Sequence, residues 1–131
     1  MRFYLIGLGS NIAPQKNLPA AIRELAALGQ LTSVSEVLAT ETVGDTYSGE
    51  FCNQLALLQC ELPPPMLKHR LLSIESKLGR EPKSPARKSH DRTIDLDILT
   101  VADNAAECRQ APLTEAYYRD IQQKWNQGVN V

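Results

Sequence analysis

The stretch DRTIDLDIL, residues 91–99, alternates apolar and acidic residues in the manner of a β-strand with two unlike faces. Side chains along a strand point to opposite faces in turn. Ile94, Leu96 and Ile98 therefore share one face, whereas Asp95 and Asp97 share the other. At a rise of ~3.3 Å per residue, the Cα atoms of the two aspartates lie ~6.5 Å apart. The stretch predicts a strand that is buried on one face and carries two carboxylates on the other.

The paired acids need a positive partner, because two carboxylates this close raise each other's pKa. A hard cation is one such partner: Mg²⁺ binds one or two carboxylates and completes its coordination with water and substrate phosphates. We therefore interpret Asp95 and Asp97 as a candidate Mg²⁺ site. A second interpretation stays open, in which both acids are solvated or paired with neighbouring lysines and arginines.

A basic segment, GREPKSPARKSHDR (residues 79–92), directly precedes this strand. Between residues 80 and 92 it places five cations against the acids Glu81 and Asp91, and these cations are Arg80, Lys83, Arg87, Lys88 and Arg92. Arginine and lysine bind phosphate oxygens, and a metal held by nearby acids can bridge the same phosphates. The combination favours a polyphosphate substrate, although a charge run by itself is commonly solvated surface.

Composition limits the class of protein. The chain has 131 residues, of which 43% are apolar and 22% charged, with a formal net charge of −1. This length predicts one domain over residues 1–131, and the near-neutral charge gives no reason to expect binding to nucleic acid or membrane. No apolar run approaches the ~20 residues of a membrane-spanning helix, and the start MRFYLIGLGSN lacks a signal-peptide cleavage pattern. Three cysteines without CxxC spacing favour reduced thiols and a cytoplasmic location.

Hydrophobic periodicity predicts four strands and two helices. The strands are expected at residues 3–9, 31–40, 51–60 and 93–99. The first helix is expected from an N-cap at Asn17 to Gly29, and the second from the prolines at 63–65 to Gly79. The order β-α-β-β-α-β predicts an α+β, ferredoxin-like fold, in which both helices pack on one face of an antiparallel sheet. The other face would then be free to carry a site.

The C-terminal segment APLTEAYYRDIQQKWNQ, residues 111–127, predicts one more helix. Leu113, Tyr117, Ile121 and Trp125 recur every four residues and would form its apolar stripe. We expect this helix to pack on the domain itself. A homodimer contact is the next possibility, because tyrosine and tryptophan are favoured at interfaces.

Three motifs carry a family resemblance: GSN (residues 9–11) after the first strand, FCN (51–53) on the third, and RTIDLDI (92–98). The last reproduces the specific pattern R-T-x-D-L-D-I. Over about residues 4–100 the chain thereby resembles the 6-hydroxymethyl-7,8-dihydropterin pyrophosphokinase (HPPK) family, whereas residues 101–131 form a divergent tail. The resemblance agrees with the ferredoxin-like order of elements.

The resemblance implies a reaction of folate biosynthesis, in which the pyrophosphoryl group of ATP moves to the hydroxymethyl oxygen of the reduced pterin and AMP is released. Two Mg²⁺ ions would be held by Asp95 and Asp97. The other implied roles are phosphate binding by Arg92, a closing loop with Arg80, Lys83, Arg87 and Lys88, nucleotide contact by Glu75 and Ile98, and pterin binding by Thr42, Val43, Phe51 and Asn53.

The chain departs from the family pattern in three places. Residues 89–91 are Ser-His-Asp where the family usually has W-G-P, and residues 40–42 are Thr-Glu-Thr where T-x-P is common. A P-H-P stretch with a following arginine and phenylalanine is missing after the fourth strand. One alternative is therefore a non-catalytic member that binds nucleotide, pterin or a partner chain. Another sets the resemblance aside and treats the chain as a regulatory or interaction domain with an incidental acid pair.

Overall fold

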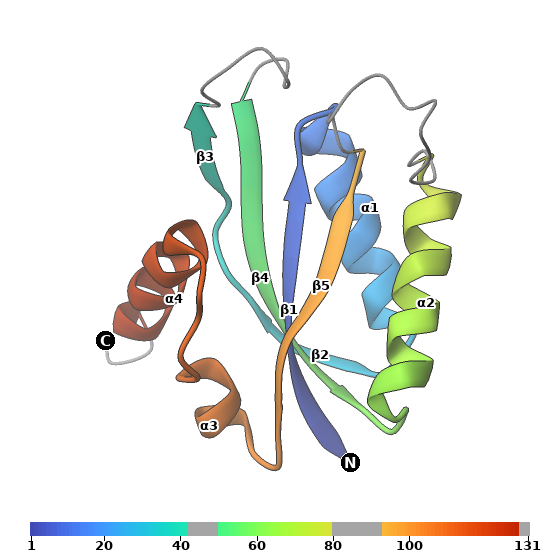
Figure 1. Ribbon diagram of the computed structural model, residues 1–131, viewed down its shortest axis with the longest axis vertical. Coiled ribbons are helices and arrows are strands. Elements are labelled where there is room, and N and C mark those ends of the chain that lie inside the picture. Colours follow the sequence, from blue (N-terminus) through green and yellow to red (C-terminus); the bar gives the residue numbers. More distant parts are fainter. Residues whose placement is uncertain (42–49, 80–92, 129–131) are drawn as a thin grey trace.

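The computed structural model describes residues 1–41, 50–79 and 93–128, and its elements are labelled in Figure 1. In chain order these elements are β1 (Arg2–Ser10), α1 (Pro14–Ala26), β2 (Gln30–Val34), β3 (Leu38–Glu41), β4 (Glu50–Cys60), α2 (Pro64–Lys77), β5 (Asp95–Ala102), α3 (Ala105–Arg109) and α4 (Ala116–Gly128). The fold is the predicted α+β arrangement of helices on an antiparallel sheet.

The described strands form one antiparallel sheet in the order β2-β4-β1-β5, with β3 paired to β4 beyond the end of β2. β1 and β4 are therefore central. β5, which carries the acid pair, is an edge strand that pairs with β1.

The strand expected at residues 31–40 is interrupted, and this makes five strands instead of four. Ser35 lies at the break between β2 and β3. Its N–H donates to Leu55 O (2.9 Å), and its hydroxyl accepts from Leu55 N (2.8 Å). Gln54 Nε2 also donates to Ser35 O (2.8 Å). These bonds satisfy both backbone groups of Leu55 and the carbonyl of Ser35 where the strand ladder is broken.

Helix α1 begins earlier than expected. Its first residue is Pro14, and Asn17 lies inside the first turn rather than at the N-cap. Proline suits the first helical position because its φ is preset and its missing N–H would have no helical partner there. The Asn17 amide instead donates from Nδ2 to Ile12 O (2.6 Å). The helix ends at Ala26, three residues before the expected Gly29.

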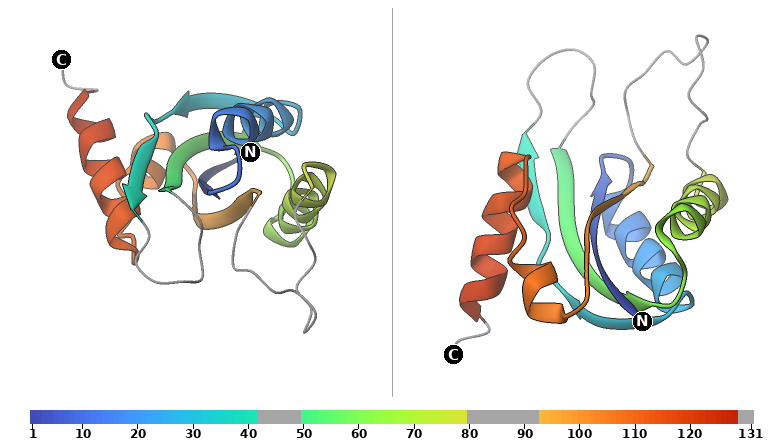
Figure 2. Two further views of the ribbon diagram at one scale, coloured as in Figure 1. Left: turned by 90° about the horizontal axis from the view of Figure 1, so that it is seen from above. Right: turned by 60° about the horizontal axis from the view of Figure 1, so that its bottom comes forward.

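Helices α1 and α2 cover one face of the sheet, as expected (Figure 2). The buried side chains between the helices and the sheet come from alternate positions of the strands and from one stripe on each helix. They include Tyr4, Ile6, Leu8, Leu18, Leu25, Ala56, Leu58, Leu67, Leu71, Ile94 and Leu96. Burial of this apolar surface is the main term that stabilises the layer.

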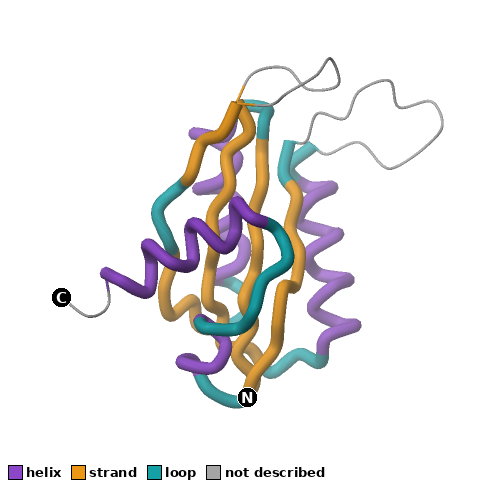
Figure 3. The backbone as a smooth tube through the Cα atoms, turned by 60° about the vertical axis from the view of Figure 1, so that its left-hand side comes forward, coloured by secondary structure: helices purple, strands orange, loops and turns teal. Residues whose placement is uncertain are grey.

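The second face of the sheet is not free, which corrects the expectation for this side. Helices α3 and α4 lie on it, and Figure 3 shows α4 crossing the strands. Leu5, Leu55 and Leu57 point to this face and are buried with Cys108 and Ile121. The runs FYLIGL and LALL are apolar at consecutive positions, so both faces of β1 and β4 need cover.

Helix α4 packs on its own sheet, but its buried stripe differs from the predicted one. Tyr118 is buried, whereas Tyr117 is 39% exposed. The helix begins at Ala116, so Leu113 lies before it and the inward positions are Tyr118, Ile121 and Trp125. These follow the three-and-four spacing of an amphipathic helix. Within the part of the chain that the structure describes, no helix has the length and apolar character needed to cross a membrane.

Candidate active site

The candidate site is a row of side chains across the strands at one end of the sheet. Gly9 of β1 pairs with Asn53 of β4 on one side and with Asp95 of β5 on the other. Two residues along, Gly7 pairs with Leu55 and with Asp97. Because side chains two apart in a strand share a face, the register brings the amide and both carboxylates to the same face.

The acid pair lies on β5 as predicted, on the face opposite to the buried Leu96. Both aspartates are half-buried. Lys68 of α2 reaches around the sheet edge, and its Nζ lies 3.9 Å from Asp97 Oδ1. The two side chains are 49% and 46% exposed, so this ion pair is weak. The carboxylates therefore keep access to solvent and to a ligand.

Two glycines of β1 let aromatic rings lie against the backbone beside the acids. A Cβ at Gly9 would lie 2.8 Å from Cε1 of Phe51 and 3.0 Å from Nδ2 of Asn53. A Cβ at Gly7 would lie 2.6 Å from both Cζ and the hydroxyl oxygen of Tyr118. Any larger residue at either position would displace a ring, so the glycines shape this surface.

Tyr118 of α4 is a site residue that the sequence prediction missed. Its hydroxyl is hydrogen-bonded to Asn53. Burial is the main cause that raises the pKa of Tyr118, followed by the neighbouring Tyr117 and the charges of Asp95 and Asp97, and the Asn53 bond partly opposes the rise. The phenol is therefore protonated at neutral pH. Its three-residue spacing from Ile121 is the signal that could have identified it.

Backbone contacts hold the ends of β1 and β5 together beside this row. The hydroxyl of Ser10 donates to Thr93 O (2.7 Å), with Ile12 O also within reach at 3.1 Å. Asn53 Nδ2 donates to Leu8 O (3.3 Å). The predicted GSN and FCN motifs thus lie next to each other and next to the first residues of β5.

Glu75 and Ile98, predicted to contact the nucleotide, lie on the other side of β5. Glu75 is buried on α2, and its Oε2 accepts a hydrogen bond from Leu96 N (2.7 Å). Ile98 packs against the core beneath α1 and α2. The structure therefore does not bring these two side chains to the face that carries the acid pair.

The remaining predicted site residues lie outside the described part of the chain. They are Thr42, Val43, Arg80, Lys83, Arg87, Lys88 and Arg92. The described ends that flank them, of β3 and β4 and of α2 and β5, lie at the end of the sheet where β1 also ends (Figure 1).

The chemistry of this row fits a divalent cation. Two carboxylates of one strand supply oxygen ligands, and among the described residues no larger cluster of histidine, cysteine and acidic side chains could hold a metal. Mg²⁺ is commonly held by one or two carboxylates together with phosphates of a substrate. Fold and site together define a class: an α+β, ferredoxin-like protein with a pair of carboxylates as its candidate cation site.

The chain belongs to the 7,8-dihydro-6-hydroxymethylpterin-pyrophosphokinase (HPPK) family, whose model matches residues 5–122. The matched range continues past β5 and includes Tyr118. The resemblance inferred from the three motifs is thereby confirmed.

Curated relatives agree with this assignment. A protein of Porphyromonas gingivalis is 36% identical over 101 residues, which cover 76% of this chain and 69% of the relative. One of Synechocystis is 35% identical over 113 residues (84% of this chain, 55% of the relative), and one of Methylorubrum extorquens is 39% identical over 101 residues (75% and 61%). Each carries the name 2-amino-4-hydroxy-6-hydroxymethyldihydropteridine pyrophosphokinase. The matches thus leave part of each relative's length uncovered.

Proposed function

We propose that this protein transfers the pyrophosphoryl group of ATP to the hydroxymethyl oxygen of 6-hydroxymethyl-7,8-dihydropterin and releases AMP, a step of folate biosynthesis. The observation that carries the proposal is the acid pair, which shares one sheet face with Asn53 and Phe51 in a chain of the HPPK family. Such a transfer requires that the two substrates are positioned and that the phosphate charge is neutralised. We propose that the row of side chains across β4, β1 and β5 does both.

Asp95 and Asp97 are the proposed metal ligands, for two Mg²⁺ ions. When bound, Mg²⁺ neutralises charge on the triphosphate and orients it for displacement. The protein's own contribution is to hold both carboxylates on one rigid strand at ~6.5 Å Cα spacing, so that no rearrangement is needed when the nucleotide arrives.

Phe51 and Asn53 are the proposed pterin contacts, with Thr42 and Val43 beyond the end of β3. The Phe51 ring offers an apolar face on which a flat heterocycle can stack. Asn53 donates to Leu8 O and is hydrogen-bonded to Tyr118. A side-chain amide has two donors and two acceptor sites, so Asn53 has capacity for a ligand beyond these bonds.

The basic segment supplies the proposed phosphate contacts. Arg92 and Arg80 belong to the proposed catalytic set with the two aspartates, and the proposed nucleotide-binding residues are Lys83, Arg87, Lys88, Glu75 and Ile98. Glu75 and Ile98 lie on the α2 side of β5, so any nucleotide contact that they make would come from that side.

The proposed substrates are small molecules, and we propose that the reaction takes place in the cytoplasm, without nucleic acid or membrane. The three cysteines are free thiols and buried, which agrees with a reducing compartment. A homodimer through α4 remains a prediction.

A second candidate function is binding without transfer. The observation in its favour is that α4 covers the sheet next to the acid pair and engages Asn53 through Tyr118. Such a protein would bind Mg²⁺ and nucleotide, or pterin, yet turn nothing over.

Release of AMP from ATP and 6-hydroxymethyl-7,8-dihydropterin tests the proposed reaction. We expect Mg²⁺-dependent release that Asp95→Asn and Asp97→Asn each lower by about 100-fold or more, because the amide removes a charge that is needed where phosphate charge develops. Asp103→Asn is the matched control: this acid is exposed just beyond β5, and its loss should leave the rate unchanged.

Thermal unfolding with Mg²⁺ and a non-hydrolysable ATP analogue separates the two candidate functions. Ligand bound only to the folded state raises the melting temperature. A rise that needs both aspartates, without AMP release above background, would favour binding without transfer. A wild-type melting curve that the ligand leaves unchanged would contradict the nucleotide site in both candidate functions.

A further inference from the structure

Lys68 of helix α2 is a cation that the proposed reaction does not yet use, and it reaches the acid pair. Its Nζ lies 3.9 Å from Oδ1 of Asp97. The other cations proposed for this site belong to the basic segment, residues 79–92. Lys68 therefore approaches the carboxylates from a different element, across the edge of the sheet that β5 forms.

The packing of α2 on the core and on β5 fixes the place of Lys68. Leu67 and Leu71, which precede and follow Lys68 in the helix, are buried in the core. Two turns further along, the carboxylate of Glu75 accepts a hydrogen bond from Leu96 N (2.7 Å), between the two aspartates. The helix is thus held against the strand that carries the acid pair, and Lys68 is exposed at its margin.

The ion pair between Lys68 and Asp97 is weak enough for a metal ion to displace it. The two side chains are 49% and 46% exposed, and exposed ion pairs contribute at most about 1 kcal/mol. A divalent cation carries twice the charge of an ammonium group and coordinates carboxylate oxygens directly. Lys68 can therefore leave Asp97 when Mg²⁺ occupies the acid pair, and its ammonium group then has three N–H donors beside the metal site.

We propose that Lys68 is a further nucleotide-binding residue, which pairs with Asp97 in the absence of Mg²⁺ and binds a phosphate oxygen of the nucleotide in its presence. This inference rests on the proposed pyrophosphokinase function. A polyphosphate brings several negative charges to a site that already holds two carboxylates, so cations beyond the metal stabilise the complex. A lysine suits both positions, because its ammonium group is a point charge on a flexible stem.

Lys68→Gln tests the two positions separately, because they predict opposite changes in affinity. Without nucleotide, the variant should bind Mg²⁺ a few-fold more tightly, because a competing cation is gone. With saturating Mg²⁺, it should bind a non-hydrolysable ATP analogue about fivefold to tenfold more weakly, because a charge-assisted bond to phosphate is lost. Shifts of the β5 amides in ¹H–¹⁵N spectra follow the first titration, and calorimetry measures the second.

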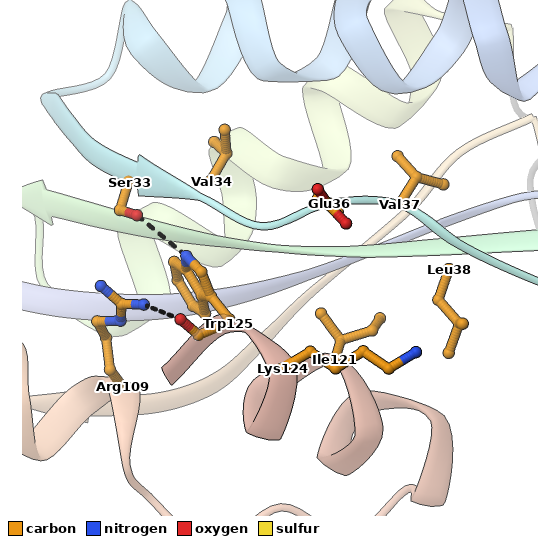
Figure 4. Close-up of a pocket in the computed structure, with 9 residues that line it drawn as sticks. All are labelled: Ser33, Val34, Glu36, Val37, Leu38, Arg109, Ile121, Lys124 and Trp125. Carbon is orange, nitrogen blue, oxygen red and sulfur yellow. Dashed lines mark hydrogen bonds between the residues drawn. The ribbon is translucent and has the colours of Figure 1, made fainter. Parts of the chain in front are cut away.

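Three variants serve as controls. Lys68→Arg keeps the charge and should stay within about twofold of the wild type for both ligands. Arg70→Gln removes an exposed cation two residues further along α2, where the side chain points to another side of the helix. Lys124→Gln makes the same substitution at the opposite edge of the sheet, where Lys124 lines a cavity between α4 and the strands β2 and β3 (Figure 4). Arg70→Gln and Lys124→Gln should leave both affinities unchanged.

Two results would overturn the role of Lys68 alone. Tighter binding of both ligands by Lys68→Gln would show that Lys68 is a counter-ion of the acid pair and does not bind phosphate. Unchanged affinities would show a solvated surface lysine. If the wild type does not bind the analogue with Mg²⁺, the proposed nucleotide site is contradicted and the role of Lys68 with it, so the two kinds of failure are distinguishable.

Discussion

At the residue scale, Tyr118 connects the C-terminal helix to the candidate active site. Its ring fills the space over Gly7, and its hydroxyl is hydrogen-bonded to Asn53 beside the two aspartates. The side chain thereby fixes the orientation of the amide that we propose for pterin binding. The ring and the hydroxyl of Tyr118 make separate contacts, and a single substitution can remove the hydroxyl while it keeps the ring.

Tyr118→Phe keeps the ring over Gly7 and removes only the hydroxyl. We expect the free energy of unfolding to fall by about 1–2 kcal/mol, because the buried Asn53 loses a hydrogen-bond partner. Urea unfolding measures the change. Tyr117→Phe, at the exposed neighbour, should change stability by less than about 0.5 kcal/mol. Equal effects of the two variants would show that the Asn53 bond contributes nothing.

The buried thiol of Cys108 should make the free energy of unfolding depend on pH. Burial raises the pKa of its thiol from 9.0 to about 11. The folded state therefore retains a proton that the unfolded state loses, so this contribution is fully present below pH 9 and is lost between about pH 9 and 11. Cys108→Ala should show a shallower fall in unfolding free energy over that window. Parallel pH profiles of variant and wild type would contradict the prediction.

At the element scale, sequence pattern identified β5 but not the break between β2 and β3. Acidic and apolar residues alternate over residues 94–98, so a period of two predicted a strand there and the shared face of its two aspartates. One continuous strand was also predicted over residues 31–40. At the break, Ser35 accepts hydrogen bonds from Gln54 and Leu55, about twenty positions away, and no local pattern contains these partners.

The stripe of α4 was predicted correctly at Ile121 and Trp125 but not at the tyrosine, for a related reason. Counting in fours from Leu113 selects Tyr117, but the helix begins only at Ala116. The start of a helix sets which side chains face inward, and this start has no strong capping signal in the sequence. The structure consequently identified Tyr118 as the site tyrosine, although its three-residue spacing from Ile121 was a signal that the sequence contained.

We expect a hydrogen bond between Glu75 of α2 and the backbone of β5 to hold this strand in place. Its carboxylate accepts from Leu96 N, the residue between the two aspartates (2.7 Å). Glu75→Ala should lower the free energy of unfolding by about 2–3 kcal/mol, because a buried N–H loses a charged acceptor. Glu75→Gln retains an acceptor and should lose less.

Chemical denaturation of these variants can be compared with that of Glu24→Ala. Glu24 pairs with Lys77 on the surface, where loss of an ion pair costs less than about 1 kcal/mol. We also expect Glu75→Ala to weaken Mg²⁺-dependent binding of the ATP analogue, because β5 presents the acid pair. Normal binding by a folded Glu75→Ala would show that the bond does not position the aspartates.

At the scale of the whole molecule, the sheet is covered on both faces. Consecutive apolar residues in β1 and β4 indicated this in the sequence, whereas the two-helix order suggested cover on one face only. The β-α-β-β-α-β order of elements predicted only the layer that α1 and α2 form on the first face. The continuous apolar runs of β1 and β4 need cover on the second face, which α3 and α4 provide, and the end of the sheet with the acid pair carries polar side chains on that face.

Substitution of two neighbouring leucines of β4 tests whether α4 covers the sheet of its own chain in solution. Leu58 faces α1 and α2, Leu57 faces α4, and both are buried. If α4 packs within the chain, Leu57→Ala should destabilise the fold by about as much as Leu58→Ala, on the order of 2–5 kcal/mol in urea unfolding. The melting temperature should then be constant over about a hundredfold range of protein concentration, since no association is linked to folding. A melting temperature that rises with concentration, and falls to a common value in Leu57→Ala, would instead support the homodimer through α4.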